Sequence, residues 1–552
     1  MEPNLPFRAV ETTRLLAPDL THFQPHNLPF FLFFIFLIAL AFCGWGCGSG
    51  VGSLAKTSTA LSADATGATS PLLPAGSSSN AAAIISVSVT PSVASTPAGR
   101  TIQFNASVQG AASDKSVTWG ALLGTVTSSG LYTAPSTAGT DTITAVSDAD
   151  PTKFASTTVS ILAAAPLNAV NLLKFGNAGF GGDDTNVLQT ALNSTAANGQ
   201  VLEIPAGNYN INPLSFPNNA NVFVDAGATV TANSGYADGV TMLNISSSNV
   251  TIAGAGAAVS VFHMLKAEYT SGEQRHCMYI VNASNVTISG ISCNDSGGDG
   301  LYLASSTNVT VEDCIFNNNR RQGSSITGGV NHVHYLRDHF TNTNGTAPQS
   351  GIDVEPNAPG GFLLDVNITD CYTDNNAGDG LMVSLWMLNS SSQPVGVTVL
   401  RNHSTGNQRY GYFANNNDPS NASGTILIQD SFSDQSGSYG AVGRFYAANG
   451  ASLTFQNLTV TNPHVNGPDP VLGDSAAVGV VRGGGGSIAL GNVHFLNTTI
   501  AITNGKSDRY FNFQDGSGIG IKNVEFEPNS LSGATNTPPN GLDQGSGANA
   551  ID

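Results

Sequence analysis

Charged residues are scarce in this chain of 552 residues and make up only 10% of it. An average soluble protein has about a quarter. Gly, Ser, Thr and Asn take their place, while the hydrophobic fraction stays ordinary at 41%. Disordered chains combine high net charge with few apolar residues, so this composition argues against disorder. It favours a long β structure with many turns and few helices.

Positive charge is scarcer still, with 19 Lys and Arg against 37 Asp and Glu and a net charge of −18. Nucleic-acid binding needs clustered cations that neutralise phosphates, so we expect no nucleic-acid partner. An acidic polysaccharide is not excluded, because a local basic patch or a bound cation would hold one.

Cysteine is also rare. Six cysteines in 552 residues do not form a disulfide framework. Cys293, Cys314 and Cys371 fall at the ends of repeating strands. We expect them to be small buried apolar side chains rather than disulfides or metal ligands.

The hydrophobic run over residues 29–42 (PFFLFFIFLIALAF) is too short for a comfortable membrane span. It matches the core of a signal peptide, and Ala39-Leu40-Ala41 supplies the small-x-small pattern that a signal peptidase needs. Residues 1–47 are therefore interpreted as an export signal. Residues 48–83, rich in Ser, Ala, Thr and Gly, are interpreted as a flexible tether.

A cysteine followed by such a tether resembles a bacterial lipoprotein, but neither cysteine here has a clean lipobox. Phe42 is bulky before Cys43, and Gly44 is a poor match three residues before Cys47. Release and lipid anchoring both stay open. We expect a bacterial protein that is secreted or anchored at the cell surface or outer membrane, with membrane contact only through a lipid on Cys43 or Cys47.

Residues 84–163 read as a small β-sandwich, because short alternating runs are separated by turn signals. The order VTWGALLGTVTSSGLYTAP, then DTITAVSDADPTKFASTTVSIL, resembles the bacterial Ig-like group 2 domains, with Trp119 and Gly130-Leu131-Tyr132 as the most specific elements. The resemblance implies a spacer or presentation module, and we find no titratable cluster here that would carry chemistry.

The region 167–530 repeats itself. A strand of Asn followed by alternating apolar residues recurs, for example as NVTIAG at Asn249, NVTISGISC at Asn285 and NVTVEDCIF at Asn308. A second strand follows most of these after a glycine, as in GLYL, GIDV and GLMV. Two strands per repeat cannot bury their apolar faces alone, so stacking as parallel coils around one core is expected. Asparagine at the bends tolerates left-handed backbone and can bond its neighbours in a ladder.

The start of this region, FGNAGFGGDDTNVLQTALNSTAANGQVLEIPAGNYNI, contains one amphipathic helix. Asp183, Asp184 or Thr185 would cap it, and it would cover the open end of the coils. This segment has the order Gly-Asp-Asp-Thr, then a helix, then a strand ending in Pro-Ala-Gly-x-Tyr. The order resembles the N-terminal part of proteins of the pectate lyase-like superfamily, and more narrowly of the rhamnogalacturonase/epimerase-type pectate lyase domain. The expected fold is all-β: a right-handed parallel β-helix of about eleven coils with an N-terminal capping helix, behind a small Ig-like β-sandwich. Residues 531–552 are expected to be a disordered tail.

In each second strand the residue after the glycine should point inward and the next one outward. The outward residues on successive coils are Tyr302, Ser325, Asp353, Met382 and Phe413. Glu355 lies two residues after Asp353, so both carboxylates are expected to face solvent on one wall. Several polar residues lie just before these glycines, and we expect them within one or two coils of Asp353. Together with Tyr302 they are predicted to bind the substrate. They are Asp299, Gln322, Asp379, Arg409 and Tyr410.

Three interpretations of this cluster compete. In a lyase of uronate-containing glycans, Arg321 or Arg320 would abstract a proton while Asp353, Glu355 or Asp299 holds Ca²⁺. Asp353 and Glu355 are the predicted calcium ligands. In an inverting glycoside hydrolase one carboxyl would be the acid and another the base. Strand positions i and i+2 are roughly 6.5 to 7 Å apart, at the lower end of the roughly 6.5 to 9.5 Å range of such enzymes. In the third interpretation the cluster only forms surface salt bridges, and the chain is a non-catalytic adhesin or glycan-binding scaffold.

The polygalacturonase-type hydrolases of the superfamily carry Asn-Thr-Asp, an Asp-Asp pair and Gly-His-Gly on consecutive coils. The matching region reads CNDSGGDGLYL and then NNNRRQGSSI, without the Asp-Asp and the Gly-His-Gly. This departure counts against the standard hydrolase. An enzyme acting on a polysaccharide, predicted to be acidic, by β-elimination is therefore the leading hypothesis.

Overall fold

The computed structural model describes residues 84–110, 113–416, 422–446, 450–470, 472–482, 487–517, 519–535 and 542–544. The predicted export signal (1–47), with Cys43 and Cys47, and the tether (48–83) lie outside the described residues. No helix in these ranges is both long enough and apolar enough to cross a membrane.

The first described part, residues 84–162, is built of short strands around its own core. Its four-stranded sheet has the order β2 (Val93–Pro97), β9 (Phe154–Leu162), β8 (Gly139–Ser147) and β5 (Val117–Ala121). The other pairings join β1 (Ile84–Thr90) with β4 (Asn105–Gly110), and β7 (Leu131–Thr133) with β3 (Thr101–Gln103) and β6 (Thr125–Val126). The core contains Phe104, Tyr132, Ile143 and Val159. We call this part the N-terminal β-domain; its likeness to Ig-like domains stays a prediction.

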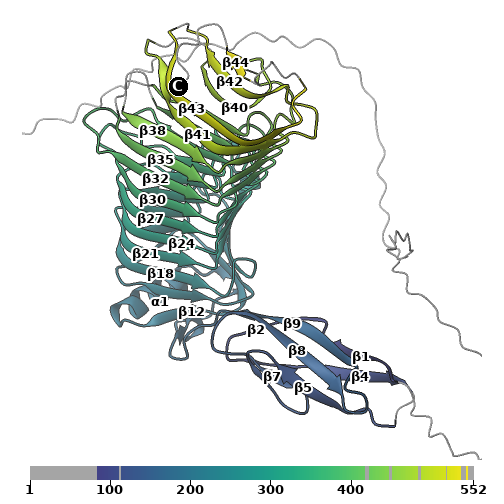
Figure 1. Ribbon diagram of the computed structural model, residues 1–552. Helices are drawn as coiled ribbons and strands as arrows, with labels where there is room; N and C mark the ends of the chain where they lie inside the picture. The colour runs from purple at the N-terminus through teal and green to yellow at the C-terminus, as the bar shows by residue number, and fades with distance from the viewer. Residues whose placement is uncertain are drawn as a thin grey trace, which may run out of the picture. The chain divides into compact units, whose positions relative to one another are not determined.

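The second part is a right-handed parallel β-helix, whose strands stack one above the other in Figure 1. It has three walls. The site wall, so named for what it carries, holds twelve strands, in line with the predicted number of coils. In order they are β14 (Leu214–Ser215), β17 (Leu243–Ile245), β20 (Met278–Val281), β23 (Leu301–Ala304), β26 (Ser324–Ile326), β29 (Ile352–Val354), β31 (Leu381–Leu385), β34 (Tyr412–Asn416), β37 (Ala441–Arg444), β40 (Ala476–Arg482), β42 (Arg509–Asp515) and β44 (Leu542–Gln544).

The long wall follows the asparagine strands of the sequence. Its order is β10 (Val170–Asn171), β12 (Val201–Ile204), β15 (Asn221–Val224), β18 (Ser248–Gly254), β21 (Ser284–Ser289), β24 (Thr307–Glu312), β27 (Val330–Leu336), β30 (Leu363–Thr369), β32 (Val395–Leu400), β35 (Gly424–Gln429), β38 (Ala451–Gln456), β41 (Leu490–Ala501) and β43 (Ile521–Ser532).

The third wall is made of shorter strands. It holds β11 (Phe180–Asp183), β13 (Gly207–Ile211), β16 (Ala228–Ala232), β19 (Ser260–His263), β22 (Ser292–Asn294), β25 (Ile315–Asn317) and β28 (His339–Thr341), then passes through a bridge at Tyr372 to β33 (His403–Thr405), β36 (Phe432–Asp434) and β39 (Thr459–Thr461).

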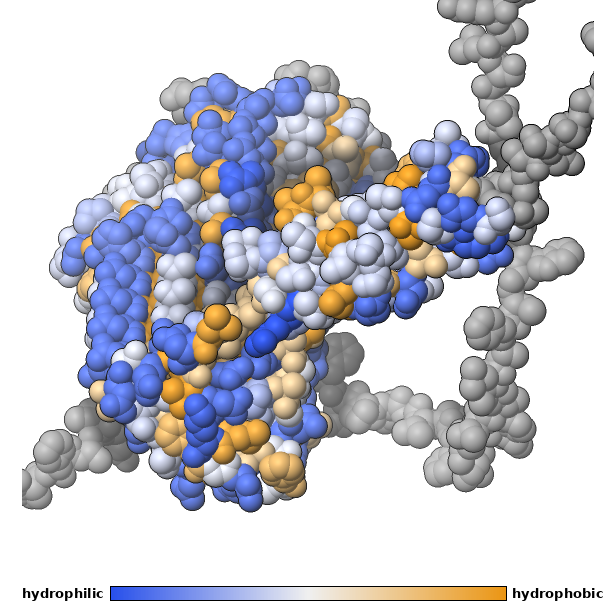
Figure 2. Space-filling model, turned by 90° about the horizontal axis from the view of Figure 1, so that it is seen from below, coloured by the Kyte–Doolittle hydropathy of each residue, from blue (hydrophilic) through white to orange (hydrophobic). Residues whose placement is uncertain are grey.

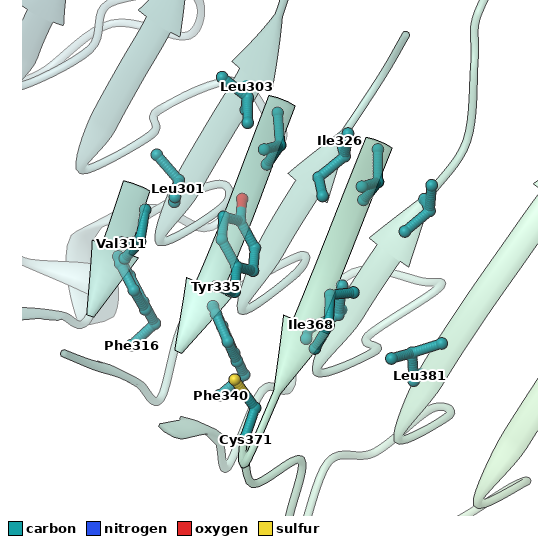
Figure 3. Close-up of a cluster of buried hydrophobic side chains, with 14 of the residues drawn as sticks. Leu301, Leu303, Val311, Phe316, Ile326, Tyr335, Phe340, Ile368, Cys371 and Leu381 are labelled. Carbon is teal, nitrogen blue, oxygen red and sulfur yellow. The ribbon is translucent and has the colours of Figure 1, made fainter. Parts of the chain in front are cut away.

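Alternate residues of all three walls fill one continuous core, as the repeats predict (Figure 3). The rings of Phe316 and Phe340 stack on successive coils with centroids 5.1 Å apart. Each fully buried aliphatic or aromatic side chain of this kind contributes about 1.5–3 kcal/mol through removal of its apolar surface from water. Four cysteines, Cys277, Cys293, Cys314 and Cys371, are free and buried in the same core, which confirms the prediction for the last three.

An asparagine ladder runs along one bend of the coils. Asn249, Asn285 and Asn308 have φ values of 59°, 56° and 54°, the left-handed conformation that asparagine tolerates better than most residues. The amide of Asn285 donates to Asn249 Oδ1 at 2.9 Å, and that of Asn308 donates to Asn285 Oδ1 at 3.0 Å. The predicted ladder is therefore confirmed.

The capping helix α1 (Thr185–Ala197) lies next to β12 at the N-terminal end of the coils (Figure 1). Asp184, one of the three predicted cap residues, is its N-cap residue, and Leu188, Ala191 and Leu192 are buried against the core. Short 3-10 turns, η1 (Leu172–Lys174) and η2 (Lys266–Glu268), are the other helical pieces of the described chain.

Parts of the segment 531–552 are described. Strand β43 runs to Ser532, and β44 pairs in parallel with β42. The described pieces of the predicted disordered tail therefore continue the long wall and the site wall.

On the face seen in Figure 2, hydrophobic residues form separate patches among hydrophilic ones rather than one continuous area.

Candidate functional site

The outer face of the site wall carries one row of aligned side chains. The strand register pairs Tyr302 with Ser325, Ser325 with Asp353, Asp353 with Met382 and Met382 with Phe413. The residues between them along each strand, such as Ile352 and Val354, belong to the core. Asp353 therefore points away from the core, as the sequence predicts.

Asp353 does not face solvent, however, and this corrects the expectation of an exposed carboxylate pair. The residue is only 2% exposed. Its Oδ2 accepts a hydrogen bond from Gln322 Nε2 at 2.7 Å, while Oδ1 is buried without a hydrogen-bond partner. Burial raises the pKa of Asp353 well above its ordinary value, and the charge of Glu355 raises it further, whereas Arg321 opposes the shift. This carboxyl therefore keeps its proton beyond the pH at which a free aspartic acid ionises.

Gln322 positions Asp353 from the neighbouring coil. It is fully buried, and its Oε1 accepts the backbone N–H of Ser350 at 2.8 Å. Its side chain is thus held at both ends, which fixes the amide that donates to Asp353. The predicted role of Gln322 in direct substrate binding is not supported by this burial.

Arg321 lies among carboxylates from several coils. Its Nη1 is 3.4 Å from Asp299 Oδ2 and 3.4 Å from Ser325 Oγ, and its Nε is 3.7 Å from Glu273 Oε2. Burial alone would lower the pKa of Arg321, but Asp299, Asp353, Glu273 and Glu355 together raise it. Arg321 therefore stays protonated and supplies a permanent positive charge at the centre of the cluster.

Asp299 is fully buried beneath Arg321. Its Oδ2 is 3.4 Å from His276 Nδ1, and its own backbone N–H donates to the same nitrogen at 2.9 Å. Burial lowers the pKa of His276, which favours the neutral imidazole. Sequence reasoning missed His276 and Glu273, because the preceding coil has Cys277 where the later coils have the glycine that marks this position.

Glu355 occupies the exposed side of the cluster. Its Oε1 accepts a hydrogen bond from Trp386 Nε1 at 2.6 Å, and Trp386 is 47% exposed. Glu355 and Asp353 influence each other electrostatically, so both predicted carboxylates share one site although only Glu355 reaches the surface.

Asp379 and Arg409 form a second ion pair on the coils that follow Asp353. Asp379 is fully buried, its Oδ2 lies 3.5 Å from Arg409 Nη1, and burial raises its pKa. Arg409 has an exposed side chain whose guanidinium lies 5.1 Å from the ring centroid of Tyr410. Of this pair, Arg409 is the residue that a ligand can reach.

Tyr410 is a packing residue, which corrects its predicted role as a substrate contact. It is 5% exposed and belongs to an outer apolar cluster with Met382 and Phe413. Its hydroxyl donates to Asp469 Oδ2 at 3.0 Å, in the segment that covers this part of the wall.

Arg320 is also placed differently from the prediction. Its Nη1 donates to the carbonyl of Tyr269, and its Nε donates to that of Gly272 at 3.2 Å. Arg320 thus ties down the segment around Tyr269, and the structure does not join it to the Asp353 cluster.

Tyr302 begins the row and stacks along the wall. Its ring lies 5.2 Å from that of Tyr279 and 4.8 Å from the ring of His276. The next residue of the row is the small Ser325, so one side of the Tyr302 ring is not covered by another aromatic ring of the row.

The donor set does not fit Ca²⁺, which takes six to eight oxygen ligands. No group of three or more His, Cys, Asp or Glu residues in the described ranges could hold a metal ion. The cluster already contains the charge of Arg321, and one Asp353 oxygen is bonded to Gln322. The predicted use of Asp353 and Glu355 as calcium ligands therefore has no support in this geometry.

Comparisons with known proteins bear on the fold. No curated protein matches the chain. Among solved structures, the A-module of a mannuronan C-5 epimerase from Azotobacter vinelandii is similar at 16% identity and a TM-score of 0.47, over 66% of this chain and 98% of that one. A surface protein and adhesin of Streptococcus pneumoniae is similar at 12% identity and a TM-score of 0.42, over 66% and 99% of the two chains.

An exopolygalacturonase from Thermotoga maritima is similar at 11% identity and a TM-score of 0.39, over 66% of this chain and 93% of that one. These likenesses are too distant to assign an activity. Residues 214–358, which include Arg321 and Asp353, match the family described as "Right handed beta helix region".

Proposed function

We propose that the chain is a polysaccharide-active enzyme that hydrolyses a glycosidic bond with carboxyl groups of the site wall. The observation that carries the proposal is Asp353: a buried carboxyl with a raised pKa and one oxygen without a hydrogen-bond partner. A general acid must hold a proton at the working pH and have an atom available to deliver it. Asp353 meets the first requirement, and its unpartnered Oδ1 meets the second once a sugar can reach this buried atom.

Glu355 is the base of this proposal. It lies two residues from Asp353 on the same outer face and is partly exposed to water. In the reaction Asp353 gives its proton to the glycosidic oxygen, which leaves as a sugar hydroxyl. Glu355 takes a proton from the water whose oxygen attacks the anomeric carbon, and solvent then restores both carboxyl groups. Because Asp353 is only 2% exposed, neighbouring side chains must turn aside for a sugar to reach it.

The β-elimination predicted from the sequence has less support. It requires Arg321 or Arg320 as a base, but carboxylates raise the pKa of Arg321 and keep it charged. Arg320 is bonded to the backbone around Tyr269 instead. Product analysis separates the reactions, since elimination creates an unsaturated, ultraviolet-absorbing sugar and hydrolysis creates only a new reducing end.

The test is digestion of a broad panel of neutral and acidic polysaccharides by the full chain, with and without a calcium chelator. We expect new reducing ends without ultraviolet absorption, no effect of the chelator, and loss of turnover in Asp353→Asn. Unsaturated products would instead establish the lyase. No product from any glycan, combined with glycan binding that Asp353→Asn leaves intact, would establish the rival function of a non-catalytic adhesin or scaffold.

The placement of the protein in the cell belongs to the same proposal. The signal-like segment 1–47 and the tether support export, either with release of the protein or with a lipid on Cys43 or Cys47 as its membrane anchor. The N-terminal β-domain would then hold the β-helix away from the cell as an Ig-like spacer. Mass spectrometry of the mature N-terminus tests both points, because it reads the cleavage site and any lipid directly.

A further inference from the structure

A groove crosses the bend between the site wall and the long wall beside the proposed active site. It consists of two adjoining cavities of about 570 and 500 Å³, which share Ser305, Gly329 and Phe362. Tyr302 of the site wall lines one cavity, and Leu364 of the long wall lines the other. Both volumes lie in the range of about 300–1,000 Å³ that is usual for ligand pockets.

None of the described residues that line the two cavities has a charged side chain. The lining consists of hydroxyl and amide side chains, glycines, alanines, the rings of Tyr302 and Phe362, and Leu364. An anionic sugar bound here would meet no cation among the lining residues, in a protein of net charge −18.

The groove offers free hydrogen-bonding groups. The side-chain amides of Asn282, Asn331 and Asn357 form no hydrogen bond with another described residue, and each amide can donate and accept. Asn282 and Asn357 are exposed, and Asn331 is half-buried. Such amides suit sugar hydroxyls, while the two aromatic rings suit the apolar faces of sugar rings.

The groove also continues the active site. Asn357 follows Glu355 by two residues, and Tyr302 stands in the same outward row as Asp353. We propose that the groove binds an uncharged stretch of the polysaccharide next to the bond that is cut, so that the substrate is a neutral glycan rather than the acidic one predicted from the sequence. This inference rests on the proposed function for the place of cleavage, but binding in the groove can be measured without turnover.

The experiment measures binding of neutral oligosaccharides (cello-, xylo- and manno-oligomers) and of oligogalacturonates to the full chain by calorimetry. The Asp353→Asn variant serves as background, so that no substrate is consumed. Thr307→Arg fills the groove, because Thr307 lines it from β24. Thr310→Arg is the matched control: it lies on the same strand, is equally half-buried and lines neither cavity. Asn357→Ala removes one exposed amide without adding bulk.

We expect a neutral oligomer to bind, Thr307→Arg to abolish this binding, Asn357→Ala to weaken it by up to about tenfold, and Thr310→Arg to leave it unchanged. Equal or tighter binding of oligogalacturonate would overturn the inference, as would neutral binding that persists in both Thr307→Arg and Asn357→Ala, or no binding of any neutral oligomer.

Turnover separates this result from the proposed function. If groove binding is found but Asp353→Asn retains activity, the proposed function fails and the groove stands. If activity requires Asp353 but the groove variants bind normally, the inference fails and the proposed function stands.

Discussion

The N-terminal β-domain and the β-helix each bury an aspartate, and the two aspartates are held in opposite ways. Asp141 of the β-domain is 1% exposed and accepts hydrogen bonds from the Tyr132 hydroxyl at 2.7 Å and from the backbone N–H of Leu122, Leu123 and Gly124. Burial alone would raise its pKa, but these hydrogen bonds lower it below the ordinary value. Asp353 is 2% exposed, has one donor and an unpartnered oxygen, and its pKa is raised.

The two aspartates are equally buried, so the difference in their hydrogen bonding decides the direction in which the pKa of each one shifts. A carboxylate whose oxygens all accept hydrogen bonds stabilises a loop. A carboxyl that is buried with too few donors holds its proton and is poised to give it away. In the proposed function, the β-domain uses its aspartate for structure and the β-helix uses Asp353 for proton transfer.

The largest expected effect follows from Asp353→Asn. Asparagine can still accept from Gln322 but cannot donate an acidic proton, so turnover should fall by about 10²–10⁴-fold. The melting temperature at neutral pH should rise, because no buried carboxyl then has to resist ionisation. Initial rates and calorimetry on the same samples check both. A variant with full activity, or one that loses stability together with activity, would contradict the assignment.

The counterpart in the β-domain is Asp141→Ala. The change leaves several buried donors without an acceptor, so we expect a loss of about 3–5 kcal/mol in the unfolding free energy of that domain. Turnover on a soluble substrate should stay unchanged. Denaturant unfolding with limited proteolysis of the full chain locates the loss. Normal stability would mean that the hydrogen bonds around Asp141 are not what holds the loop at Leu122–Gly124.

The contributions of the two carboxyl groups to the stability of the fold should also change with pH in opposite directions. The pKa of Asp141 is lowered by folding, so the stability it contributes is present above the ordinary aspartate pKa and is lost as pH falls through the lower folded value. The pKa of Asp353 is raised, so its cost to stability is absent in acid and grows as pH rises above the ordinary value toward the folded one. Relative to wild type, Asp353→Asn should therefore gain stability as pH rises from about 4 toward the folded pKa of Asp353. The deficit of Asp141→Asn should be complete above about pH 4 and should shrink as pH falls below that value. Melting curves of the three proteins between pH 3 and 8 measure this divergence; parallel curves would refute it.

The smallest expected effect is a loss of stability in the asparagine ladder, which supports the coils and takes no part in the proposed reaction. Asn285→Ala should cost about 1–2 kcal/mol, because alanine is strained at a φ of 56° and loses two ladder hydrogen bonds. Asn285→Gly should recover part of that cost, since glycine adopts this conformation freely. Chemical denaturation compares the two, and an alanine variant as stable as the glycine variant would remove backbone strain as the explanation.

Sequence periodicity was sufficient to predict the site wall, the long wall, the capping helix and the outward row, because the glycine before each second strand fixes its register. It did not separate the short strands of the third wall, since only two strands per repeat were predicted. It could not predict that Asp353 is covered, since the covering groups, Gln322 and Arg321, come from another coil. It could not choose between Arg320 and Arg321, which are neighbours at a bend and point to different partners. Tyr410 was misassigned because the segment around Asp469 that buries it comes much later in the chain.

Asp353 is expected to hold its proton above the pH range in which an aspartate normally ionises. Infrared difference spectra of wild type against Asp353→Asn, recorded as pH is raised, test this protonation state, because a protonated carboxyl group absorbs at a different frequency from a carboxylate. We predict a protonated-carboxyl band that belongs to Asp353 and titrates well above the ordinary aspartate pKa of about 3.9. A difference spectrum that shows ionisation at or below that value would contradict the account.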